Sequence, residues 1–135
     1  MTDESAPVKT LLETVFGASR TVYLDEAPDG DLPDRYVIAA LSVGESEAAW
    51  CGGVESRTPT LFVTSVARGV DAESAAREAK WASRKAVDAL VSWRASIGQA
   101  SWLPEHVVSS RPQRDTDAEG VVVYVNDQFI LRYQP

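Results

Sequence analysis

Apolar residues at helical and strand spacing divide the chain into a short helix, several strands and one long helix. Near the start, apolar side chains recur every three or four residues and share one helix face, which ends at Gly17. They are Val8, Leu11, Leu12, Val15 and Phe16. Alternation then predicts a strand over 20–25, before a turn-rich segment at 27–33. Residues 1–6 are small and polar, so we expect them to be frayed.

The next part of the chain predicts two consecutive strands of one sheet. The run Tyr36–Val43 has apolar or small residues on both faces, as expected for a strand that is covered on both sides. A second strand is predicted over Thr60–Arg68. The segment between them, Gly44–Thr58, is polar and exceeds the ~2 to 5 residues usual for a hairpin loop. Loops of this length are usually functional or disordered.

A long Ala-rich helix is predicted over Ala72–Ala95. Asp71 suits its N-cap, Glu73 in the first turn favours the helix dipole, and Gly98 lies where a C-terminal stop would be. One stripe of small and apolar residues predicts the buried face. The stripe contains Ala72, Ala75, Ala76, Ala79, Ala82, Ala86, Leu90 and Trp93. Trp81 lies roughly opposite, among Arg77, Glu78, Arg84, Lys85 and Asp88.

The C-terminal part predicts further strands. Val107 and Val108 suggest that a strand starts after Pro104, and an apolar run resumes after Gly120. At Asn126-Asp127 the sequence allows a tight hairpin turn or one long strand with a bulge, and two strand segments are favoured. We therefore expect a single domain over 1–135 of the α/β (α+β) class. It has a mainly antiparallel sheet, the long helix on one face and the short N-terminal helix packed nearby.

Composition excludes several classes of protein. With 44% apolar and 24% charged residues, the chain is typical of a soluble globular protein. Its formal charge of −7 disfavours nucleic-acid binding, which depends on clustered Lys and Arg. The N-terminus lacks the basic start and apolar core of a signal peptide, and no run approaches the ~20 apolar residues that span a bilayer. We expect neither export by a signal peptide nor membrane insertion.

Candidate catalytic groups are few. The single cysteine and the single histidine exclude a disulfide and a Cys/His zinc site within one chain. His106 follows Pro104 in a predicted loop-to-strand transition, and no Gly-x-Ser-x-Gly elbow follows a strand, so a structural or surface histidine is favoured. Glu47 and Glu55 lie near Cys51 and disfavour a reactive thiolate. We therefore predict no catalysis.

Two acidic segments could in principle gather a hard cation. They are Asp25, Glu26, Asp29 and Asp31, and further along Asp115, Asp117 and Glu119. Neither has EF-hand spacing, so solvated acidic loops are favoured. No Gly-rich nucleotide-binding motif is present. The prediction is no metal and no cofactor.

Two tryptophans are predicted at exposed positions, which is typical of protein–protein contacts. Trp50 lies in the polar 44–58 loop, and Trp81 lies on the charged face of the long helix. The candidate interface is built around them. It contains Glu47, Trp50 and Val54 of the loop with Arg77, Trp81, Arg84 and Lys85 of the helix.

Several segments spread from Val8 to Tyr133 carry a family resemblance. They are Thr21-Val-Tyr-Leu, Pro28-Asp-Gly-Asp-Leu-Pro33, Tyr36-Val-Ile, Leu61-Phe-Val-Thr-Ser-Val66, the helix opened by Asp71 with Ala75, Trp81, Ala82 and Leu90-Val-Ser-Trp93, and the C-terminal Ser109-Ser-Arg-Pro, Asp115 to Gly120, Val123-Tyr124 and Phe129-Ile-Leu-Arg-Tyr133. In order and content they resemble the tail terminator proteins of long-tailed bacteriophages, particularly those of actinobacterial hosts. The match rests on element order, length and a diffuse apolar pattern.

The resemblance implies a structural role in a virion tail. Such proteins form a six-membered ring that caps the tail tube, stops its polymerisation and presents a joining surface to the head connector. DNA later passes through the ring, and an acidic lumen suits passage because it repels phosphates. The 44–58 loop is then expected to be flexible in the free subunit and ordered on the tube. Alternatives are a head-closure or neck protein of the same virion, an unrelated cytosolic binding module, and a small hydrolase.

Overall fold

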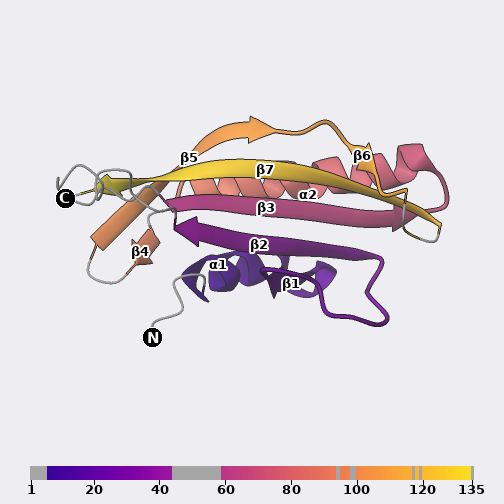
Figure 1. The fold of residues 1–135 in the computed structure, drawn as a ribbon, viewed down its shortest axis with the longest axis horizontal. Helices are drawn as coiled ribbons and strands as arrows, with labels where there is room; N and C mark the ends of the chain where they lie inside the picture. The colour runs from indigo at the N-terminus through magenta and orange to yellow at the C-terminus, as the bar shows by residue number, and fades with distance from the viewer. Residues whose placement is uncertain are drawn as a thin grey trace, which may run out of the picture.

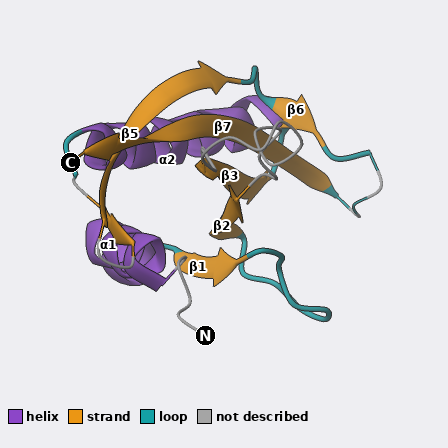
Figure 2. Ribbon diagram, turned by 60° about the vertical axis from the view of Figure 1, so that its left-hand side comes forward, coloured by secondary structure: helices purple, strands orange, loops and turns teal. Residues whose placement is uncertain are grey.

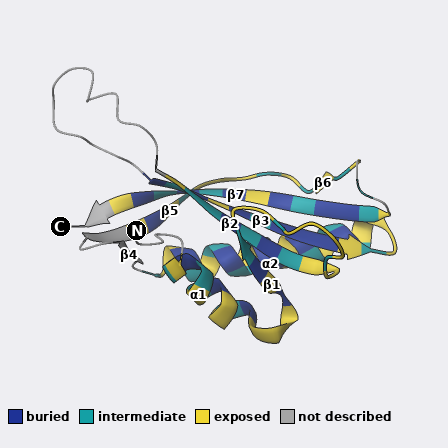
Figure 3. Ribbon diagram, turned by 60° about the horizontal axis from the view of Figure 1, so that its bottom comes forward, coloured by how far each residue is buried: buried dark blue, intermediate teal, exposed yellow. Residues whose placement is uncertain are grey.

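The computed structural model describes residues 6–43, 59–93, 95–97, 100–116, 118 and 120–134, and in them one sheet carries two helices on the same face (Figures 1 and 3). The elements in chain order are α1 (Ala6–Phe16), the 3-10 turn η1 (Gly17–Ser19), β1 (Thr21–Leu24), β2 (Arg35–Val43), β3 (Pro59–Gly69), α2 (Ala72–Val91), β4 (Ala95–Ile97), β5 (Ala100–Ser109), β6 (Gln113–Arg114) and β7 (Val121–Gln134). The predicted α+β class is confirmed.

The strand order is β1-β2-β3-β7-β5-β4, and the short β6 also pairs with β7. Only β1 and β2 run parallel; every other described pair is antiparallel. The predicted pairing of β2 with β3 is confirmed, with Arg35 opposite Ala67 and Val43 opposite Pro59. The two central strands, β3 and β7, therefore fix the positions of all the others.

The main core lies between the sheet and the two helices. It joins Val8, Leu12 and Phe16 of α1, Val22 of β1, Val37 and Ala39 of β2, Leu61 and Val63 of β3, Ala82, Ala86 and Leu90 of α2, and Phe129 and Leu131 of β7. The prediction that β2 is covered on both faces holds only for the helix side, because Tyr36, Ile38 and Ala40 on the other face are only half-buried. Phe62, on the same outer face of β3, is 41% exposed.

The long helix begins as predicted and ends earlier. The Asp71 side chain accepts a hydrogen bond of 2.7 Å from the Ser74 backbone N–H, which confirms the N-cap and holds the pKa of this carboxyl below its usual range. The predicted end at Ala95 is wrong: the helix ends at Val91, and the Ser92 hydroxyl donates a hydrogen bond to the backbone carbonyl of Asp88. The following residues form β4 instead and pair with β5.

The predicted buried stripe of α2 is confirmed for most of its length. Its fully buried members are Ala75, Ala79, Ala82, Ala86 and Leu90. Ala76 and Trp93 are half-buried, while Ala72 in the first turn is exposed and does not belong to the stripe. Ser83 is buried beside Ala82, although its hydroxyl is polar.

The C-terminal strands differ from the prediction in two places. Asn126 and Asp127 pair with Thr64 and Val63 of β3, so β7 is one strand of 14 residues and the favoured division into two segments is wrong. The irregularity lies in the neighbouring strand, between His106 and Val108 of β5. The prediction that a strand starts at Val107 and Val108 is also wrong, because these residues lie near the end of β5.

Gly69, at the end of β3, lies directly against the first turns of α2. A Cβ at this position would stand 2.9 Å from the backbone nitrogen of Ala75, a distance that side chains do not tolerate, and a backbone atom cannot yield cheaply. We predict that Gly69→Ala destabilises the protein by about 1 to 3 kcal/mol through overpacking. Chemical denaturation would measure this. The matched control is Val70→Ala, because Val70 is 91% exposed and its truncation should change stability by less than about 0.5 kcal/mol.

Candidate functional site

Trp81 lies on the outer side of α2 and is 46% exposed, as the sequence predicted. It is not isolated: its ring centroid is 6.3 Å from that of Phe16, and two cations contact it. The Arg20 guanidinium carbon is 4.6 Å from the ring centroid and the Lys85 ammonium nitrogen is 4.7 Å from it. Cation–π contacts of this kind hold the indole in one orientation. Trp81 is therefore a fixed, half-open aromatic surface.

Arg20 packs against the Trp81 ring and was not identified from the sequence. It is only 5% exposed, and one of its terminal nitrogens lies 3.1 Å from the Glu78 carboxylate, which also pairs with Arg35 at 3.5 Å. Burial lowers the pKa of the Arg20 guanidinium from its ordinary value, and the hydrogen bond to Glu78 opposes this shift. The pair joins the start of β1 to α2. The sequence signal was weak, since a basic residue just before a strand is ordinarily exposed.

The predicted helix part of the interface is brought together on one side of α2. Arg77 is exposed and pairs weakly with Glu73 at 3.5 Å, one helical turn away. Lys85 lies over Trp81, while Arg84 is one of the residues that line a neighbouring pocket. The other three predicted interface residues, Glu47, Trp50 and Val54, lie outside the residues that the structure describes, and so does Cys51.

A buried carboxylate lies where α2 crosses β7. Asp127 is 0% exposed, and the Ser83 hydroxyl donates to its Oδ2 at 2.7 Å. The Ser109 hydroxyl donates to Oδ1, and His106 Nε2 lies 2.9 Å from the Ser109 oxygen. These donors satisfy a group that would be costly to bury alone. Sequence alternation could have found it, since Val123, Val125, Asp127, Phe129 and Leu131 all face inward.

The same residue types make catalytic triads, but their order here is different. In a triad, the histidine stands between the serine and the acid and uses both ring nitrogens. Here Ser109 stands between them, and the only His106 nitrogen near Asp127 is Nε2, at 3.5 Å, the atom that also faces Ser109. The serine proton is committed to the carboxylate, so His106 cannot remove it as a base. The predicted loop position of His106 is wrong, because it lies within β5 and its ring packs 5.2 Å from that of Phe129.

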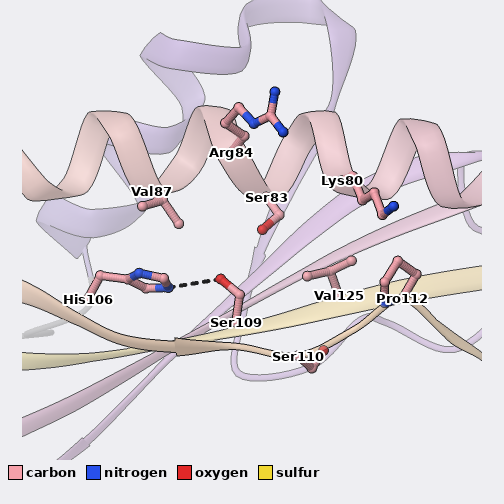
Figure 4. Close-up of a pocket in the computed structure, with 9 residues that line it drawn as sticks. All are labelled: Lys80, Ser83, Arg84, Val87, His106, Ser109, Ser110, Pro112 and Val125. Carbon is pink, nitrogen blue, oxygen red and sulfur yellow. Dashed lines mark hydrogen bonds between the residues drawn. The ribbon is translucent and has the colours of Figure 1, made fainter.

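A pocket of about 360 Å³ opens beside this cluster, between α2 and β5 (Figure 4). Its lining is Lys80, Ser83, Arg84, Val87, His106, Ser109, Ser110, Pro112 and Val125. Lys80 extends from the helix toward Pro112, and Arg84 turns outward at the rim (Figure 4). The floor is partly apolar, through Val87 and Val125, and the helix side of the mouth is basic. Such a pocket suits a group that carries negative charge.

Neither predicted acidic segment gathers into a metal site within the described part of the chain, where no group of three or more His, Cys, Asp or Glu side chains converges. Asp117 and Glu119 fall outside that part. Among the helices described, none has the length and apolar content needed to cross a membrane.

Comparison with known proteins gives a fold match. No protein-family model matches the chain, and no curated protein matches it in sequence. Among solved structures, a chain from the virion of a native gene transfer agent (GTA) particle is similar, with a TM-score of 0.65 and 15% sequence identity. The match covers 95% of this chain and 92% of that chain. The two chains therefore share one fold over nearly their whole lengths.

The buried cluster generates a stability prediction. Ser83→Ala removes the hydrogen that satisfies Asp127 Oδ2 and should destabilise the fold by about 1 to 3 kcal/mol, measured by denaturant unfolding. Ser92→Ala is the control, because its hydroxyl bonds only helix carbonyls at an exposed end. It should change stability by less than about 0.5 kcal/mol. Equal effects of the two substitutions would show that the buried bond is not special.

Proposed function

We propose that this chain is a structural virion protein that forms a ring on the end of a phage tail tube, in the manner of a tail terminator. The observation that carries the proposal is the fold match to a chain of a phage-like virion, which accounts for nearly all of both chains. The family resemblance of the sequence supports the tail terminator role within that class. In this role the ring ends tube polymerisation and offers the surface to which the head joins.

The site agrees with a role in assembly. The hydrogen bonds of the polar cluster around Asp127 hold α2 against the sheet, so this cluster has a structural role. By contrast, the outer side of α2 presents a fixed aromatic ring within a charged surface, which is the composition of many interface centres. We assign the subunit contact to Arg77, Trp81, Arg84 and Lys85, with Glu47, Trp50 and Val54 of the 44–58 loop as a second contact that meets the tube.

The proposed partners follow from the role. The chain contacts itself in a homo-hexamer, the tail tube protein below and the head–tail connector protein above, and it resides in the virion tail. A cyclic ring needs two different patches on each copy that are complementary to each other, because head-to-tail contacts close into a ring only when the rotation between copies closes. DNA crosses the lumen without specific binding.

A head-closure or neck protein of the same virion is the second candidate, because it shares the virion context and size class. Tail length separates the two. A terminator added to polymerising tail tube protein should cap the tubes and stop their growth, whereas a neck protein should leave tube length unchanged. Electron microscopy of tubes grown with and without the protein would measure this, and tubes of equal length would contradict the terminator role. An unrelated binding module would neither cap tubes nor form rings.

Trp81→Ala should weaken ring assembly, because truncation of a central aromatic anchor commonly costs ~2 kcal/mol or more. Light scattering on purified protein, with and without tail tubes, would measure the mass of the assembly. The control is Val91→Ala on the same helix, where an apolar side chain of similar exposure, 43%, should be dispensable. Circular dichroism would confirm that both variants fold. An unchanged hexamer in the Trp81 variant would remove Trp81 from the contact.

Affinity for duplex DNA should be negligible at physiological salt. Each copy carries a formal charge of −7, so a ring multiplies the repulsion of phosphates around its lumen. Gel-shift titration over a range of salt concentrations would measure this. Tight binding that falls steeply with salt would contradict a passive lumen and favour a regulatory DNA-binding protein.

A further inference from the structure

We propose that a second copy of this chain docks its acidic β1–β2 connection, residues 25–34, against the basic mouth of the pocket between α2 and β5. This proposal rests on the proposed function in one respect, namely that the contact is repeated around a ring. It names which two surfaces of neighbouring copies meet, which the fold match does not supply.

The pocket is a positive site on a negative protein. Lys80 and Arg84 lie at its mouth, and Arg114 of β6 pairs with Val123 and so shares the side of the sheet that α2 covers. Within the part of the chain that the structure describes, none of these three cations forms an ion pair. The buried carboxylate of Asp127 is already held by the hydroxyls of Ser83 and Ser109, which line the pocket. The positive charge at the mouth is thus left for a partner.

The acidic connection is the opposite surface. It contains Asp25, Glu26, Asp29, Asp31 and Asp34, all of them exposed and none of them in an ion pair with a described residue. Its start is fixed by backbone hydrogen bonds from Asp25 to Ala39 at 2.9 Å and from Glu26 to Leu24 at 2.8 Å. Gly30 adopts a positive φ of 102° at its tip. A connection anchored in this way loses less entropy on docking.

The two surfaces lie toward opposite edges of the sheet, so a copy cannot join them within itself. Four strand-to-strand steps separate β1 from β5, which is roughly 19 Å at the usual strand spacing. Figures 1 and 2 show the β1–β2 connection and β5 at opposite edges. Contact between the two surfaces therefore joins different copies. Made head-to-tail, as a ring requires, it generates rings or open filaments, whereas the same contact made reciprocally would close a two-fold dimer.

Charge complementarity favours a second copy over nucleic acid as the occupant. The connection brings five carboxylates to the cations of the pocket, while the net charge of −7 repels a phosphate backbone. Complementary charges also speed encounter and reject wrong registers. The apolar part of the lining, which includes Val87 and Pro112, can accept Pro28, which is exposed between the acidic residues.

Paired charge reversal tests the contact. Variant one is Lys80→Glu with Arg84→Glu. Variant two is Asp29→Lys with Asp31→Lys and Asp34→Lys, which makes the net charge of the connection positive. Each variant alone places like charges at its own contact and should associate at least about tenfold more weakly than the original protein in sedimentation velocity. Mixed in equal amounts, the two variants present opposite charges at every contact, so assembly should return in alternating order. The matched control is Lys80→Arg with Arg84→Lys, which retains both charges and should assemble normally.

The outcomes separate this contact from the proposed function. If each variant assembles alone as the original protein does, or if mixing them restores nothing, the contact is overturned; rings that persist would leave the terminator role standing. If mixing restores assembly into dimers or open chains that never cap tail tubes, the contact stands and the terminator role fails. A gel shift in which the original protein binds duplex DNA and variant one does not would assign the pocket to phosphates and overturn the proposal.

Discussion

The close contact between α2 and the two central strands is the constraint on which the rest of the structure depends. The helix can lie this near to β3 and β7 because its inward side is almost entirely alanine, and because Gly69 has no side chain where the chain turns from β3 into the helix. Small residues bury little apolar area each, so the stability of this contact comes from close packing along its length. The larger apolar side chains are supplied by α1 and by the strands.

Because the small side chains in this contact resemble one another, they do not by themselves fix the position of α2 along the sheet. The hydrogen bonds that Asp127 accepts from Ser83 and Ser109 supply that information, since they form at only one position of α2 relative to β7 and β5. A buried polar network that is fully satisfied can fix a unique arrangement in this way, at a cost in burial. It also places Lys80 and Arg84, on the neighbouring turn of α2, at the mouth of the pocket.

Local rules predicted the elements that local residues determine. The spacing of Val8, Leu12 and Phe16 was enough for α1, and Asp71 was enough for the start of α2, because helix faces and caps depend on residues within a few positions. The predictions that were wrong concern segments whose conformation depends on pairing with strands far away in sequence. Asn126-Asp127 has the composition of a turn, yet pairing with β3 on one side and β5 on the other keeps it extended. The same holds for the candidate site. The exposure of Trp81 could be predicted from the helical periodicity. The roles of Arg20 and Ser83 could not, because their partners, Glu78 and Asp127, are far away in sequence.

In the proposed contact between copies, the distribution of charge would let a chain that is acidic overall bind a second copy of itself. Five acidic residues lie in the β1–β2 connection, whereas Lys80 and Arg84 lie at the mouth of the pocket between α2 and β5, across the width of the sheet. At short range, the proposed contact would attract two copies only in the orientation that brings the acidic connection of one against the basic pocket of the other, because other orientations bring like charges together. Since the Debye length is about 8 Å at physiological salt, only this short-range contribution survives between docked copies. Orientation, more than affinity, is what such a charge pattern controls, and a ring requires orientation above all, because each added copy must repeat the same rotation for the last one to meet the first.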